Sequence, residues 1–142
     1  IEGAVLLTES DFTSRATQTR IVSAMDSRLA DAVISDMAPS ATGIRALDHT
    51  AIIELCRSAF NFSQSVLRED GHFLCKLWDG PDTNSLREML AVAFRMVKTL
   101  RPDASRKDSS EIFLLGRGFK KYLYHDPIHE TTRTVNHTPQ DL

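Results

Sequence analysis

Short apolar runs alternate with amphipathic stretches along most of this chain. Strand-like runs fall at residues 4–7, 32–34, 72–78, 96–100 and 111–115. Between them, apolar side chains at helical spacing predict helices over residues 16–25, 48–68 and 83–94. Strands that alternate with helices indicate an α/β fold, with a mostly parallel sheet and helices on both of its faces.

The long helix predicted over residues 48–68 has the clearest buried face. Its apolar and small residues at helical spacing are Ile52, Ile53, Cys56, Ala59, Phe60, Ser63 and Leu67. We expect Gly71 to end this helix as a left-handed cap. Ser14 is expected to cap the first helix, whose apolar stripe is Ile21, Val22 and Met25.

The last two predicted strands are joined by a charged loop over residues 101–108. This loop is too short for a helical crossover, so the two strands should form an antiparallel hairpin. We expect one domain over residues 1–118 and a loose polar tail over 119–142. Because the chain starts at Ile1 and enters strand-like sequence at once, we expect the domain's first strands to be absent.

The composition restricts the class of protein but does not indicate a function. The 142 residues carry a formal net charge of -2, which predicts no bulk attraction to nucleic acid. Cys56 and Cys75 lack CxxC spacing and are expected to be small buried side chains in a reducing compartment. No apolar stretch reaches membrane-spanning length.

Three charged residues, far apart in sequence, should meet at one edge of the sheet. Asp36 follows a short strand, and Lys76 lies near the end of another. Glu111 begins the strand that we expect to be reversed, so its start faces the same edge. Two carboxylates beside a strand lysine make a chemical site, or alternatively a buried salt-bridge network.

Other candidates carry weaker signals. His125 and His129 have Pro127 between them and no third ligand nearby, so we expect no metal site. Trp78 is either a base-stacking residue or a core aromatic. Cations outnumber acids from residue 98 to 121, and Arg106 and Lys107 are the expected RNA-phosphate contacts, unless this is only a solvated hairpin tip.

Three ordered motifs carry a family resemblance. They are Ser35-Asp36-Met37-Ala38-Pro39, then Phe73-Leu74-Cys75-Lys76, then the stretch over 101–111 that ends in Ser109-Ser110-Glu111. Together they resemble the FtsJ/RrmJ family of S-adenosylmethionine-dependent ribosomal RNA 2′-O-ribose methyltransferases. The segment 41–49 and the form Phe-Leu-Cys-Lys look most like the mitochondrial branch, which modifies large-subunit rRNA.

The resemblance implies a Rossmann-like methyltransferase fold, S-adenosylmethionine as cofactor and a mitochondrial location. By motif, Asp36, Lys76 and Glu111 match three members of the family's Lys-Asp-Lys-Glu catalytic tetrad. Asp11 and Phe12 match the pair that contacts the cofactor's adenine, and Asp36 faces its sulfonium. The first tetrad lysine, the glycine-rich cofactor loop and the acid that binds the cofactor's ribose lie upstream of Ile1 in the family.

Two questions stay open at this point. Lys76 either removes the proton of the ribose hydroxyl as a neutral base or steers that hydroxyl as a cation. The function is either methylation of large-subunit rRNA or the work of a catalytically silent RNA-binding or ribosome-assembly module. A related methyltransferase acting on tRNA or mRNA caps is a third alternative, which segment 41–49 disfavours.

Overall fold

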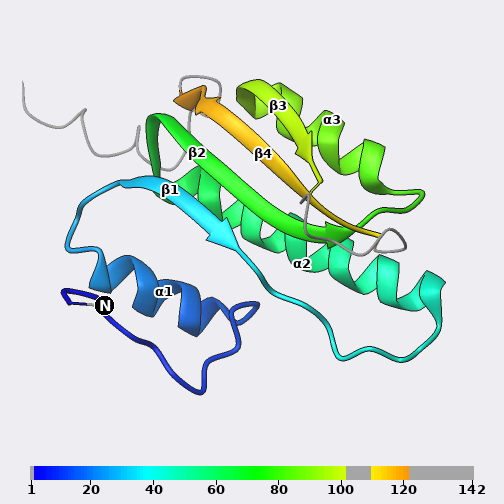
Figure 1. Ribbon diagram of the computed structural model, residues 1–142. Helices are drawn as coiled ribbons and strands as arrows, with labels where there is room; N and C mark the ends of the chain where they lie inside the picture. Colours follow the sequence, from blue (N-terminus) through cyan, green and yellow to red (C-terminus); the bar gives the residue numbers. More distant parts are fainter. Residues whose placement is uncertain (1, 102–109, 122–142) are drawn as a thin grey trace, which may run out of the picture.

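A four-stranded sheet with helices against it forms the part of the chain that the computed structural model describes, residues 2–101 and 110–121. The elements follow the alternation expected from the sequence (Figure 1). In chain order they are α1 (Arg15–Ala24), β1 (Ala30–Ser35), α2 (Arg45–Val66), β2 (Leu67–Trp78), α3 (Thr83–Ala93), β3 (Phe94–Leu100) and β4 (Glu111–Phe119).

The sheet has the strand order β1-β2-β4-β3. β1 pairs with β2 in parallel, whereas β4 is antiparallel to both β2 and β3. The predicted terminal hairpin is therefore confirmed, and β4 lies between β2 and β3 rather than at the sheet's edge. Because β4 pairs directly with β2 in antiparallel orientation, the start of β4 lies beside the end of β2, where Glu111 pairs with Trp78.

The core lies between the sheet and the helices α2 and α3. The buried face of α2 contains the predicted set except Leu67, with His49 and Val66 added, and Leu67 is buried as the first residue of β2. Four phenylalanines form a connected cluster, with ring centroids between 5.5 and 6.4 Å apart: Phe60, Phe73, Phe94 and Phe119. Each fully buried phenylalanine contributes about 1.5–3 kcal/mol through the hydrophobic effect, so this cluster anchors the sheet.

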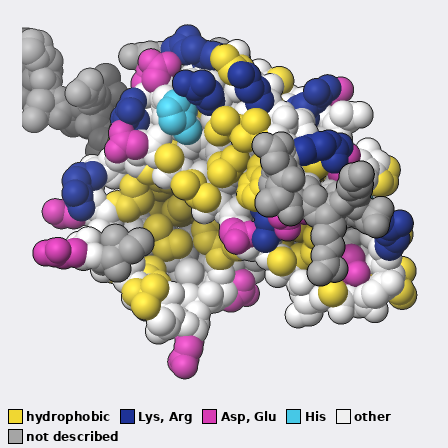
Figure 2. Space-filling view, viewed as in Figure 1, with side chains coloured by type: hydrophobic (Ala, Val, Ile, Leu, Met, Phe, Trp, Pro, Cys, Tyr) yellow, Lys and Arg dark blue, Asp and Glu magenta, His cyan; other side chains and the backbone are white. Residues whose placement is uncertain are grey.

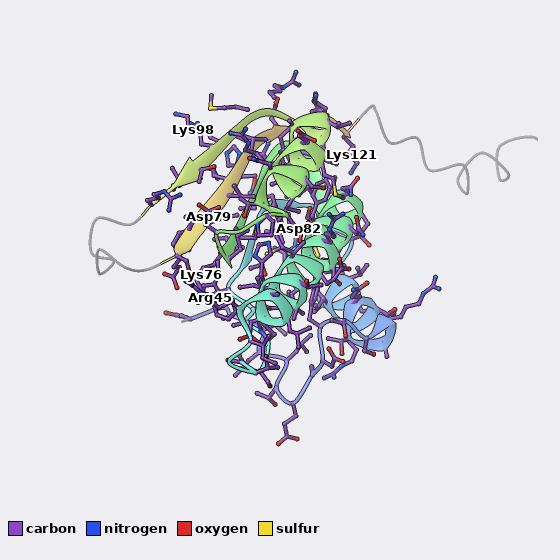
Figure 3. All side chains as sticks on the ribbon, turned by 90° about the vertical axis from the view of Figure 1, so that its right-hand side faces the viewer. Arg45, Lys76, Asp79, Asp82, Lys98 and Lys121 are labelled. Atoms are coloured by element: carbon purple, nitrogen blue, oxygen red, sulfur yellow. The ribbon has the colours of Figure 1, made fainter. Side chains whose placement is uncertain are left out.

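The helices of the described residues cover one face of the sheet, not both as predicted. Figures 1 and 3 place α1, α2 and α3 on the same side. On the opposite face, apolar side chains gather over the strands (Figure 2). Ile34 of β1 is an exposed apolar side chain, with 73% of its surface accessible. The alternation of strands and helices predicts the layers, but it does not say which face each helix takes.

Two local predictions are wrong. Residues 4–7 form no strand, and Leu6 is 82% exposed. Gly71 does not cap α2, because the helix ends at Val66 and β2 begins at the next residue. The left-handed residue is Asp70, with φ of 62°, while a Cβ on Gly71 would approach the backbone oxygen of Arg68 to 2.9 Å.

The remaining predictions concern the cysteines, the start of α1, membrane-spanning helices and the charged loop and tail. Both cysteines are free and buried, as predicted. Ser14 occupies the N-cap of α1 without a side-chain hydrogen bond, and Val22 of the predicted stripe is exposed. Within residues 2–101 and 110–121, no helix is long and apolar enough to cross a membrane. Arg106, Lys107 and the tail from residue 122 lie outside the described residues.

Candidate active site

Asp36, Lys76 and Glu111 meet at one edge of the sheet, as the topology predicts. In the parallel pair, Ser35 lies opposite Cys75, so the next residues, Asp36 and Lys76, are neighbours. The Lys76 Nζ atom is 2.5 Å from Asp36 Oδ1 and 3.7 Å from Glu111 Oε2. We refer to these three side chains as the charged cluster.

The charged cluster opens to solvent. The Lys76 side chain is 23% exposed, whereas those of Asp36 and Glu111 are 72% and 35% exposed. The alternative of a buried salt-bridge network therefore does not describe it. Solvent-screened ion pairs contribute at most about 1 kcal/mol to stability, so folding alone gives little reason for this arrangement.

The electrostatics of the charged cluster favour the ammonium form of Lys76. The hydrogen bond with Asp36 raises the pKa of Lys76 above its ordinary value, and the charges of Asp36 and Glu111 act in the same direction. Desolvation opposes them. Since the ordinary value is already 10.5, Lys76 is a cation at neutral pH in this arrangement. Such a group donates hydrogen bonds to a nearby oxygen and does not remove its proton.

A cavity of about 320 Å³ lies next to Asp36, between the segment before α1 and the end of β1. Its lining is mostly apolar and includes Phe12, Ile21 and Met37. Phe12 is held by an edge-to-face contact with Phe62, with ring centroids 5.4 Å apart. Its size and apolar walls suit a flat heterocycle such as adenine.

Asp11 lies beside this cavity but is not among its lining residues. Asp11 Oδ1 accepts hydrogen bonds from the backbone N–H of Thr13 at 2.9 Å and from its hydroxyl at 2.8 Å. These bonds hold the pKa of Asp11 below its ordinary value. Phe12 thus lines the cavity, whereas Asp11 precedes it in the chain without lining it.

The turn after β2 is fixed by a buried histidine that the sequence analysis did not single out. His49 Nδ1 donates to the Trp78 carbonyl at 3.1 Å, and His49 Nε2 accepts from the Asp82 N–H at 3.1 Å. A Cβ on Gly80 would lie 2.6 Å from the imidazole, so the turn packs directly on that ring. His49 is thus a positioning residue, and its place in a helical stripe was its only sequence signal.

The cations expected near the hairpin divide into two kinds. Arg101 pairs with Asp79 at 2.6 Å, and Lys121 Nζ donates to the Leu67 carbonyl, so both support the fold. Lys98 and Arg117 lie on the sheet face away from the helices. Lys98 of β3 pairs with Leu115 of β4, and Arg117 follows two residues later on β4. Among residues 2–101 and 110–121, no group of three His, Cys, Asp or Glu side chains is placed to hold a metal ion.

Comparison with known proteins gives one consistent family. Residues 1–119 match the profile of FtsJ-like methyltransferases. The chain is 42% identical over 125 residues to rRNA methyltransferase 2, mitochondrial, of Caenorhabditis elegans, covering 85% of this chain and 58% of that protein. It is 38% identical over 120 residues to the protein of that name in Drosophila melanogaster, covering 84% of this chain and 48% of that protein.

A bacterial relative is similar in sequence, and a solved structure has the same fold. Ribosomal RNA large subunit methyltransferase E of Acinetobacter baylyi is 39% identical over 119 residues, covering 84% of this chain and 55% of that protein. A crystal structure of a ribosomal RNA methyltransferase from Plasmodium falciparum has the same fold, with a TM-score of 0.67 and 22% identity over 78% of this chain and 61% of that one. The chain spans about half the length of the curated relatives it matches. This chain belongs to the family of FtsJ-like methyltransferases.

Proposed function

We propose that this protein methylates the 2′-hydroxyl of a ribose in large-subunit ribosomal RNA of the mitochondrion. The observation that carries the proposal is the charged cluster, in which two carboxylates hold one lysine ammonium at an open sheet edge. The names of all three relatives support ribosomal RNA as the substrate, that of the bacterial relative supports the large subunit, and those of the two animal relatives support the mitochondrion. Asp36, Lys76 and Glu111 are the residues to which we assign the chemistry.

Lys76 orients the hydroxyl that is to be methylated. Its ammonium donates a hydrogen bond to the 2′-oxygen and fixes the direction of that oxygen's lone pair. Such positioning lowers the activation free energy of a displacement reaction by several kcal/mol, because the reacting atoms are already held in the required geometry. As the O–CH3 bond forms and the S–CH3 bond breaks, the hydroxyl proton leaves to water, which reaches this solvent-exposed cluster. Asp36 and Glu111 fix the ammonium, and Asp36 also offers negative charge to a positive centre beside it.

S-adenosylmethionine supplies the methyl group, activated by attachment to a positive sulfur. The apolar cavity lined by Phe12 and Met37 fits its adenine, and Asp36 lies where that cavity meets the charged cluster. We assign Asp11 and the backbone of Phe12 to adenine recognition and Asp36 to the sulfonium end.

RNA is held by cations outside the charged cluster. Lys98 and Arg117 share the open face of the sheet. Arg106 and Lys107 belong to the same charged stretch of the sequence, and we propose that they contact phosphates as well. These contacts give affinity that falls as the salt concentration rises, whatever the RNA sequence.

Substitution of Lys76 tests the proposal. In the protein isolated from its natural source or expressed from its whole gene, Lys76→Ala should abolish methyl transfer to large-subunit rRNA and leave the affinity for S-adenosylmethionine nearly unchanged. Arg87→Ala is the matched control, because Arg87 is an exposed cation on α3, remote from the charged cluster. Near-normal turnover by Lys76→Ala would remove Lys76 from the mechanism.

A further inference from the structure

A second cavity, of about 620 Å³, lies between the start of α2 and the turn that follows β2. Its lining includes Arg45, His49, Trp78, Asp79, Pro81 and Asp82. It shares no lining residue with the cavity beside Phe12. The volume lies within the range of small-molecule sites, about 300–1,000 Å³, so it has room for more than a water cluster.

This cavity lies at the same sheet edge as the charged cluster. Trp78 comes two residues after Lys76 on β2 and pairs with Glu111 of β4. Two residues of a strand span about 6.6 Å, which is a short step along a nucleic-acid chain. Figure 3 labels Asp79 and Asp82 above Lys76 and Arg45 in this view, and Arg45, Asp79 and Asp82 line the cavity together with Trp78. A polymer bound at Lys76 therefore reaches this cavity with its next nucleotide.

One part of the cavity wall is apolar and fixed. Trp78 is half-buried, and Pro81 adds an apolar side chain with little conformational freedom. The two hydrogen bonds of His49 hold the turn that carries them. Aromatic side chains on a rigid support are the usual stacking platforms for unpaired bases.

Asp82 supplies a carboxylate at this cavity whose oxygens can still accept hydrogen bonds. It occupies the N-cap of α3 but makes no side-chain cap hydrogen bond, and within residues 2–101 and 110–121 no donor is hydrogen-bonded to its carboxylate. Asp79 and Asp48, by contrast, are bonded to Arg101 and to Thr42. Asp82 Oδ2 lies 3.7 Å from His49 Nε2, a nitrogen that already accepts the Asp82 N–H.

An ionised carboxylate only accepts hydrogen bonds, through two oxygens side by side. The Watson–Crick edge of guanine matches it, because N1–H and the 2-amino group are adjacent donors. Adenine and cytosine offer one donor beside an acceptor, and uracil offers one donor between two acceptors. The two oxygens of the Asp82 carboxylate therefore match guanine better than the other three bases.

Arg45 is placed to meet the phosphate of such a nucleotide. It is the exposed first residue of α2, and no described carboxylate pairs with it. Its guanidinium binds phosphate oxygens through paired donors. The cavity thus combines an aromatic wall, an acceptor for a base edge and a cation for a phosphate.

We propose that this cavity binds a guanine nucleotide of the RNA substrate, the neighbour of the nucleotide that is methylated. The proposal rests on the proposed function for its RNA context, whereas recognition of guanine rests on the cavity alone. The bound guanine fixes the register of the RNA, so that one particular ribose lies at Lys76.

Trp78 is the only tryptophan of these 142 residues, and a Trp78→Phe variant identifies the part of the protein's fluorescence that reports on this cavity. Titration of the protein with GMP should quench Trp78 in a saturable way. IMP, which lacks only the 2-amino group, should bind about tenfold more weakly, and UMP more weakly still. Equal quenching by GMP, IMP and UMP, or no quenching by GMP, would overturn the assignment.

Two variants separate the base from the phosphate. Asp82→Asn should abolish the preference for GMP over IMP, while Asp26→Asn, a control on an exposed turn, should keep it. Arg45→Ala should lower the affinity for GMP to that for guanosine and leave the affinity for guanosine unchanged. A full preference for GMP in Asp82→Asn, or undiminished binding of GMP by Arg45→Ala, would contradict the assignment.

The same variants distinguish this inference from the proposed function. Asp82→Asn should methylate large-subunit rRNA with reduced selectivity for the guanine-flanked site, while Lys76→Ala should lose methyl transfer and keep quenching by GMP. If methylation fails in every form of the protein but GMP is still selected, the proposed function fails and guanine recognition stands. If RNA containing the guanine does not compete with GMP, the ligand is a free nucleotide and the placement of RNA is wrong.

Discussion

Removal of the His49 side chain should destabilise the domain and disorganise the turn after β2. In the folded protein, His49 bridges the Trp78 carbonyl and the Asp82 N–H, at 3.1 Å each. It is 7% exposed, so His49→Ala leaves both backbone groups without these partners and opens a gap beside Gly80.

The expected cost follows from those contacts. Two hydrogen bonds contribute about 1 kcal/mol each, and the lost packing of the ring adds roughly another 1 kcal/mol, for a total of about 3 kcal/mol. For a domain of this size, that loss lowers Tm by roughly 10 °C. His49→Asn retains a donor near the position of Nδ1, and His49→Gln retains an acceptor near that of Nε2, so each should recover about half of the loss.

Thermal unfolding followed by circular dichroism measures these differences. His72→Ala is the matched control, because His72 lies exposed on β2 and should change stability by less than about 0.5 kcal/mol. If His49→Ala and His72→Ala unfold at the same temperature, His49 does not hold the turn. Equal losses in the Ala, Asn and Gln variants would show that ring packing, and not hydrogen bonding, matters at this position.

Two further predictions concern the charged cluster and the core. The pKa of Lys76 is raised above its unfolded value of 10.5, so its contribution to stability is complete below that pH and is lost as pH rises through the folded value. Asp36→Asn should remove this part of the alkaline unfolding curve, and an unchanged curve would contradict the ion pair. Gly116→Ala should cost about 1–3 kcal/mol in urea unfolding, because its Cβ would lie 2.7 Å from the buried Phe94 ring. A variant as stable as the native chain would show that the ring shifts freely.

The charged cluster was predictable because strand direction decides it. Asp36 and Lys76 lie at the ends of parallel strands, and a reversed strand brings its first residue, Glu111, to the same edge. This reasoning needs only the order and direction of strands, which the apolar pattern supplies. It needs no knowledge of register.

Register and pairing order account for what the sequence did not predict. Nothing in residues 111–119 says that β4 enters between β2 and β3. The dipeptide Asp70-Gly71 resembles the end of a helix. In the structure it lies inside β2, where the pairing with β1 shifts register between Ala30 and Ala32. Tertiary pairing thus overrides the local turn preference.

The second cavity could not be predicted from the sequence, for a different reason. Its walls come from the start of α2, the turn after β2 and the residue before β4, and no motif links these segments. Arg45 and Asp82 read as ordinary surface charges in the sequence. Only folding brings them to the same opening.

Transfer of a labelled methyl group is the most direct test of the account. The protein from its natural source is incubated with S-adenosylmethionine labelled in its methyl group and with unmodified large-subunit mitochondrial rRNA, and the RNA is then digested to nucleosides. We expect the label in a single 2′-O-methylnucleoside, and none when Lys76 is replaced by alanine. Label on a base, or no label with the native protein, would contradict the assignment of Asp36, Lys76 and Glu111 to ribose methylation.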